Sequence, residues 1–100
     1  MLTGKQRAQL RTLANGLDTI LYIGKSGITD TLAKQAEDAI TARELIKGRV
    51  QENAPLTARE ACTELAVRIG AEEVQVIGYR FVLYRENREL KPEKRIKLKK

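Results

Sequence analysis

Residues 17–29 read LDTILYIGKSGIT, and this stretch decides how the chain folds. Its apolar first half is typical of a short strand, GKSG at positions 24–27 indicates a turn, and Thr29 followed by Asp30 marks a helix start. Two glycines in a turn leave backbone N–H groups unobstructed, and a helix N-terminus behind them adds partial positive charge. The stretch therefore fits either a phosphate-binding loop or an ordinary strand-to-helix turn.

Capping signals and apolar periodicity divide the rest of the chain. Thr3 with Gln6, and Thr57 with Glu60, form capping boxes that open two further helices. The patterns predict helices over 4–14, 30–42 and 58–69, and strands over 17–23, 44–50, 74–77 and 81–84. This αβαβαββ order predicts an α/β fold of the two-layer α+β type with a four-stranded mixed sheet. Strands separated by helices should be parallel neighbours, and a final hairpin adds an antiparallel strand.

Length and charge indicate one basic domain with a basic tail. One hundred residues fit one domain, and the net charge is +6. Residues 86–100 carry seven basic and three acidic side chains, so most of the excess charge lies there. We predict a folded domain over residues 1–86 and a basic, flexible tail over residues 87–100. Such a balance favours polyanionic partners.

Two patterns bear on the surface of the sheet. Lys47 and Arg49 alternate with apolar residues, which predicts that one sheet face is partly uncovered. Tyr22 and Phe81 are expected in the core. Tyr79, between Gly78 and Arg80, is expected either to stack on an unpaired base or to pack locally in the hairpin.

Residue types argue against catalysis and against a metal site. The chain has no histidine, and its carboxylates are scattered over predicted helices. The single cysteine, Cys62, lies among helix formers and is expected to be a small buried side chain in a reducing compartment. We expect no cofactor, no metal and a monomer. No apolar run reaches the length of a membrane span, and no signal peptide is evident, so we expect a cytoplasmic protein without a membrane partner.

Three blocks of sequence resemble the CRM domain family, named for chloroplast RNA splicing and ribosome maturation. They are YIGKSGIT at 22–29, ELIK at 44–47 and GYRFVLYR at 78–85. The similarity covers about residues 2–86 and is strongest to stand-alone bacterial members of the YhbY type. The resemblance implies a sheet like that of the C-terminal domain of translation initiation factor three. It also implies RNA binding and, for bacterial members, association with precursors of the large ribosomal subunit.

The resemblance and the charge pattern together select candidate residues. The family's GxxG loop, which contacts RNA, matches positions 24–27, and Lys47 falls on a family strand position. Basic residues on or beside the other predicted strands extend the surface. The predicted RNA-binding residues are Gly24, Lys25, Ser26, Gly27, Lys47, Arg49, Arg80 and Arg85. Gly48 replaces a branched apolar residue of many members, which predicts a weakened or bulged strand.

The sequence favours a non-enzymatic RNA-binding protein that aids ribosome maturation, with large-subunit ribosomal RNA in pre-ribosomal particles as its partner. One alternative is a protein-interaction module of an assembly-factor complex, in which the uncovered sheet face binds another protein. A second alternative is an enzyme acting on a phosphate ester, with the glycine loop as substrate cradle. The absence of a general base and of metal ligands argues against the enzyme.

Overall fold

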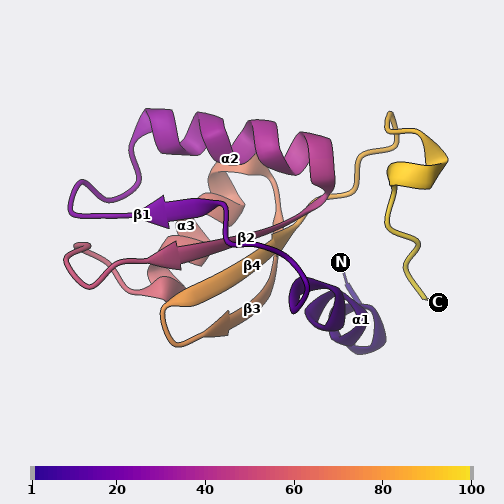
Figure 1. The fold of residues 1–100 in the computed structure, drawn as a ribbon, viewed down its shortest axis with the longest axis horizontal. Coiled ribbons are helices and arrows are strands. Elements are labelled where there is room, and N and C mark those ends of the chain that lie inside the picture. The colour runs from indigo at the N-terminus through magenta and orange to yellow at the C-terminus, as the bar shows by residue number, and fades with distance from the viewer. Residues whose placement is uncertain (1, 100) are drawn as a thin grey trace.

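Three α-helices and four strands make up residues 2–99, the part of the chain that the computed structural model describes (Figure 1). They are α1 (Gly4–Ala14), β1 (Leu21–Ile23), α2 (Asp30–Arg43), β2 (Leu45–Val50), α3 (Ala58–Ile69), β3 (Glu72–Ile77) and β4 (Arg80–Tyr84), followed by the 3-10 turn η1 (Pro92–Lys94). The predicted αβαβαββ order and α+β class are confirmed. β1 is shorter than predicted, and β3 begins earlier, at Glu72.

Threonine caps fix where each helix begins. The hydroxyls of Thr3, Thr29 and Thr57 each accept a hydrogen bond from the backbone N–H three residues further on. Gln6 and Glu60 return a side-chain hydrogen bond to the capping residue, so both predicted capping boxes are confirmed. An N-cap of this kind stabilises a helix by about 1 kcal/mol.

The sheet has the strand order β1-β2-β4-β3. β1 and β2 are parallel neighbours joined through α2, as predicted. The same reasoning made β2 and β3 parallel neighbours, because α3 separates them in sequence, and this expectation is wrong. β4 turns back from the β3–β4 hairpin and lies antiparallel to both, in the space between them. β2 and β4 are therefore the two central strands.

Each sheet face carries its own hydrophobic cluster. α2 and α3 cover one face, where Ile40 and Leu65 pack against Phe81 and Leu83 of β4. On the other face, α1 and part of the C-terminal segment pack at one end of the sheet, and the remaining end is uncovered (Figure 1). The prediction of a partly uncovered face is confirmed, and the uncovered end is available for contacts with other molecules.

Gly48 of β2 lies directly opposite Phe81 of β4. A Cβ atom at position 48 would come within 2.3 Å of the Phe81 Cζ atom, so the ring occupies the space that a side chain would need. β2 keeps an unbroken register with β4, so the prediction of a bulge at Gly48 is wrong. The register shift lies instead in β3, between Glu73 and Gln75.

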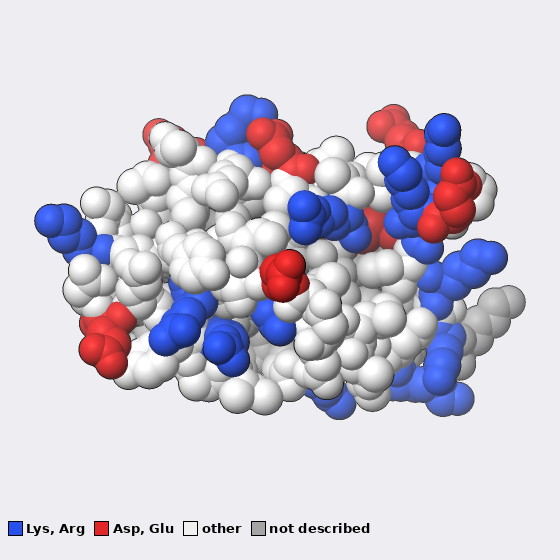
Figure 2. Space-filling model, in the orientation of Figure 1, with Lys and Arg blue, Asp and Glu red and all other residues white. Residues whose placement is uncertain are grey.

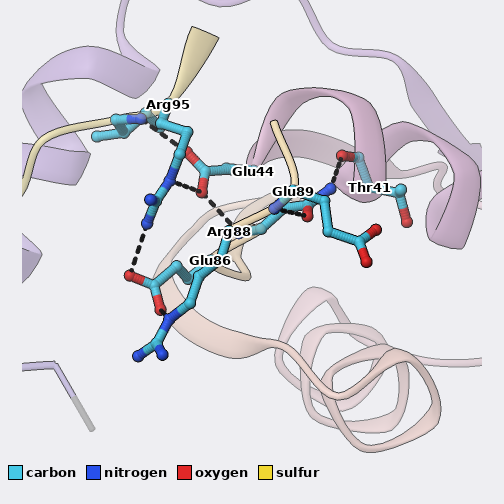
Figure 3. A network of polar contacts seen from close by, with 8 residues as sticks. Thr41, Glu44, Glu86, Arg88, Glu89 and Arg95 are labelled. Carbon is cyan, nitrogen blue, oxygen red and sulfur yellow. Dashed lines mark hydrogen bonds and ion pairs between the residues drawn. The ribbon is translucent and has the colours of Figure 1, made fainter. Parts of the chain in front are cut away.

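Glu44, at the junction of α2 and β2, is a fully buried carboxylate with a left-handed backbone (φ 64°). Its Oε2 accepts the backbone N–H of Asn87 at 2.7 Å, and its Oε1 accepts that of Ile96 at 2.6 Å (Figure 3). The Arg95 guanidinium Nε lies 3.9 Å from Glu44 Oε2, and its Nη2 lies 3.0 Å from Glu86 Oε2. One carboxylate therefore ties both ends of the segment 87–96 to the domain.

The last described residues lie against α1. Backbone groups of Lys97 and Lys99 form hydrogen bonds of 2.8–2.9 Å with the side chains of Gln6 and Gln9. The apolar residues that alternate with these lysines pack against the second cluster: Ile96 and Leu98. Flexibility of residues 87–100 stays a prediction, and position 100 lies outside the described residues. The contacts identify the surface on which the segment rests.

Gly48→Ala is expected to lower the free energy of unfolding by ~1–3 kcal/mol, because the new methyl group and the Phe81 ring need the same space. Urea unfolding measures the change. Gly4→Ala is the matched control, since a Cβ atom there meets nothing within 4 Å. Combining Gly48→Ala with Phe81→Leu should cost less than the sum of the two single changes, and simple additivity would contradict the proposed clash.

Glu44→Gln is expected to lower the free energy of unfolding by ~1–3 kcal/mol, because an amide turns one of the two buried acceptors into a donor that faces a backbone N–H. Hydrogen exchange measured by NMR should show faster exchange at the amides of Asn87 and Ile96. The control is Glu86→Gln, a half-exposed carboxylate whose removal should change stability by less than about 0.5 kcal/mol. Unchanged protection at both amides in Glu44→Gln would contradict the proposed role of the carboxylate.

Candidate nucleic-acid interface

The segment between β1 and α2 is a tight turn at one end of the molecule (Figure 1, left). The Gly27 N–H donates to the Gly24 carbonyl oxygen at 2.9 Å and closes the turn. Lys25 and Ser26 occupy its two central positions, and both are exposed. The turn therefore presents a cation and a hydroxyl at its tip, two kinds of group that contact phosphate in nucleic-acid-binding proteins.

The two glycines of this turn are required by packing inside the protein. A Cβ atom on Gly24 would lie 2.9 Å from Gln51 Oε1, and one on Gly27 would lie 3.3 Å from Pro55 Cγ. Gly27 also has φ +68°, which L side chains rarely adopt. The turn packs against the segment between β2 and α3, and the missing side chains make this packing possible. A larger residue at position 27 would strain the turn whether or not RNA touches it, so only Lys25 and Ser26 can report on contact.

Four side chains form a row across the uncovered end of the sheet, one from each strand. Arg49 of β2 is in register with Tyr22 of β1 and Arg80 of β4, and Arg80 is in register with Ile77 of β3. Partners in register lie on the same face of a sheet. All four are exposed, Tyr22 by 55% and Ile77 by 63%. We call Tyr22, Arg49, Arg80 and Ile77 the open row.

Arg49 and Arg80 lie opposite each other without a counter-ion. Within residues 2–99, neither side chain has a hydrogen-bond or ion-pair partner. Figure 2 shows lysine and arginine side chains gathered over the region where Figure 1 draws β2 and β4. Like charges directly opposite on neighbouring strands destabilise a sheet. An anion bound between them would relieve this repulsion.

Two other predicted residues are used inside the fold. Lys47 Nζ donates to the Leu17 carbonyl oxygen at 3.2 Å and is only partly exposed. Arg85 follows β4 on the helix side of the sheet, where its Nη1 donates to the Ile69 carbonyl oxygen and its Nη2 pairs with Glu37, both at 2.6 Å. The Arg85 guanidinium holds the pKa of Glu37 below its ordinary value. The structure thus places Lys25, Ser26, Arg49 and Arg80 on open surface and Arg85 elsewhere.

The single cysteine, Cys62, lies buried in α3. Burial, followed by the nearby Glu73 carboxylate, raises the pKa of the Cys62 thiol to about 12, so the thiol is protonated at neutral pH. No group of three or more metal-ligating side chains occurs within residues 2–99. None of the helices over that span is long and apolar enough to cross a bilayer.

Tyr22 is the residue that the sequence analysis misplaced. The prediction that it belongs to the core is wrong, whereas Phe81 is buried as predicted. Leu21 and Ile23 on either side of Tyr22 are fully buried, so the two-residue period of a strand turns Tyr22 to the opposite face. The run of residues 20–23 is apolar or aromatic throughout, so the sequence carries no signal that separates Tyr22 from its buried neighbours. Tyr79, in the β3–β4 turn, is 53% exposed.

A hollow of about 480 Å³ lies beside the open row and the glycine turn. The open row contributes Tyr22 and Arg49 to its lining, and the segment after β2 contributes Gln51, Glu52 and Asn53. Gln51 also faces Gly24, so the hollow and the turn share a wall. Residues 51–53 are not among the predicted site residues, because a polar segment after a strand has no distinguishing pattern.

Comparisons with known proteins identify the family of this chain. The family model for the CRS1 / YhbY (CRM) domain matches residues 2–85. Probable RNA-binding protein YqeI of Bacillus subtilis is 41% identical over 91 residues, covering 91% of this chain and 95% of its own length. A protein of Haemophilus influenzae named RNA-binding protein is 32% identical over 90 residues, covering 90% of this chain and 91% of its own length.

A solved structure has the same fold. The solution structure of the hypothetical protein SAV1595 from Staphylococcus aureus superposes with a TM-score of 0.71 at 43% sequence identity. The match covers 99% of this chain and 100% of that one. Fold, sequence and family model agree over nearly the whole chain, and this chain therefore belongs to the CRS1 / YhbY (CRM) domain family.

Proposed function

We propose that this protein binds RNA without catalysing a reaction, and that its contact surface consists of Lys25, Ser26, Arg49 and Arg80. The observation that carries the proposal is the pair of exposed arginines held opposite each other with no counter-ion among the described residues. The names of the relatives in Bacillus and Haemophilus support the same ligand.

The surface suits a sugar-phosphate backbone. Guanidinium groups form two parallel hydrogen bonds with phosphate oxygens, and Lys25 adds a point charge at the turn. The Ser26 hydroxyl can donate a hydrogen bond to a further phosphate oxygen. Such contacts position an RNA on the protein but carry little sequence information. Most of the binding free energy should therefore depend on salt concentration.

The RNA that we propose is the precursor of large-subunit ribosomal RNA, bound in the cytoplasm by a monomer during subunit maturation. Support comes from the family resemblance and from the chemistry of the surface. Arginines on an exposed sheet end reach folded RNA without entering a narrow groove, and shape then contributes to selection.

Lys25→Ala, Arg49→Ala and Arg80→Ala are each expected to weaken binding to a large-subunit ribosomal RNA fragment. Each change removes about one phosphate contact, so the slope of log Kobs against log salt concentration should become shallower by about one. Fluorescence anisotropy titrations over a range of salt concentrations measure both quantities.

The matched control is Arg43→Ala, which removes the same charge from an exposed site in the last turn of α2. It should leave the salt slope unchanged. Equal slopes for all four variants and the wild type would refute the proposed surface.

Crosslinking in cells, followed by sequencing of the bound RNA from fractionated ribosomal subunits, tests the proposed partner. Enrichment of large-subunit precursor RNA is the expected outcome. Predominant recovery of other RNAs would refute the ribosomal part of the proposal. Association with the particles that survives RNase treatment would favour a protein-interaction module instead.

A further inference from the structure

We propose that the hollow lined by Tyr22, Arg49 and residues 51–53 binds one unstacked nucleobase, with the base stacked on the Tyr22 ring. This inference rests on the proposed function, because it assigns a base of the bound RNA to a hollow that borders the phosphate-contacting residue Arg49. A volume of about 480 Å³ is within the range of ligand pockets, which hold roughly 300–1,000 Å³.

Tyr22 supplies a surface for stacking. Its side chain is 55% exposed, although both sequence neighbours in β1 are fully buried. An aromatic side chain held by a strand at an exposed sheet end is a rigid platform for a base, since every base has a π-face. Arg49, in register beside it, contributes a planar cation that can stack on the same base or hold its phosphate.

The rest of the lining, residues 51–53, forms a wall that can read the edge of a base. Gln51 and Asn53 carry amides, each with two N–H donors and one acceptor oxygen. Glu52 adds a carboxylate, which accepts hydrogen bonds but repels phosphate. A hollow that contains this carboxylate is therefore unsuited to a free anion and suited to a base that donates an amino group. Adenine, cytosine and guanine have such a group and uracil does not.

The backbone of this wall is held in place before any ligand binds. The Gln51 N–H donates to the Ile23 carbonyl oxygen at 2.8 Å, and the Val50 N–H donates to the Tyr79 carbonyl oxygen at 2.7 Å. The Ala54 N–H closes a turn onto the Gln51 carbonyl oxygen at 3.0 Å. The segment that carries the amides and the carboxylate is thus fixed to β1 and to the β3–β4 turn. A preformed wall lowers the entropic cost of binding a base.

The expected ligand is single-stranded or looped RNA. Bases stacked inside a duplex present only their edges in the grooves, and the deep major groove of A-form RNA excludes side chains. A base must leave the stack to lie on Tyr22. The protein should therefore prefer an unpaired segment over a duplex of the same length and charge.

Tyr22→Ala is the central test. With a short single-stranded adenine-rich RNA carrying 2-aminopurine, the variant should bind about tenfold more weakly than the wild type. The salt slope should stay the same, because no phosphate contact is removed. Tyr22→Phe should retain the wild-type affinity, and binding should quench 2-aminopurine fluorescence only when residue 22 is aromatic. Thermal unfolding of each variant confirms that the fold is kept.

Tyr79→Ala is the matched control, since Tyr79 has nearly the same exposure, 53%, but does not line this hollow. It should bind the probe as the wild type does. Glu52→Ala adds a second, independent measurement, because alanine has no acceptor for a base amino group. The wild type should prefer an adenine-rich or cytosine-rich probe over oligouridine, and the variant should lose most of this preference.

The possible failures are distinguishable. If Tyr22→Ala and Tyr22→Phe bind the probe equally well while Arg49→Ala still flattens the salt slope, the base site is refuted and the proposed function stands. If the wild type binds neither the probe nor the ribosomal fragment, both proposals are refuted. A greater loss in Tyr79→Ala than in Tyr22→Ala would refute the assignment of the platform to Tyr22.

Discussion

The close approach of the Phe81 ring to Gly48 sets the alignment of the two central strands. A one-residue slip between β2 and β4 would drive the ring into a side chain and turn every residue of one strand to the other face. The same alignment places Arg49 beside Arg80 on the opposite side of the sheet. A contact in the core therefore determines the geometry of the charged surface, although the two lie on different faces.

Local signals in the sequence predicted the helices and strands. Long-range packing determined the strand order and the role of Gly48. Capping boxes at Thr3 and Thr57 depend on neighbours three residues away, so the sequence shows them directly. The position of β4 between β2 and β3 depends on a pairing between residues more than thirty positions apart, which periodicity does not reveal. The sequence predicted a weakened or bulged strand at Gly48 for the same reason. The glycine makes room for the ring of Phe81, which lies far away in the sequence.

The sequence predicted that the candidate surface would be basic, but it did not predict which basic residues lie on it. The resemblance and the charge pattern selected Lys47 and Arg85 as readily as Arg49 and Arg80. The structure separates them, because the first two donate to backbone carbonyl oxygens and the last two have no partner among residues 2–99. A sequence shows which residues are basic. Only the fold shows which of them already have a partner.

The two ends of the chain share one hydrophobic cluster. Leu2 is buried in it and Leu98 packs against it, so both ends lie at the side of α1, whereas the glycine turn lies at the far end of the molecule (Figure 1). Extra sequence fused before Leu2 or after Lys99 would leave from the side of α1 and keep clear of the glycine turn. With this arrangement, several copies of the domain could be joined in one longer polypeptide, and the glycine turn and uncovered sheet end of each copy would stay exposed.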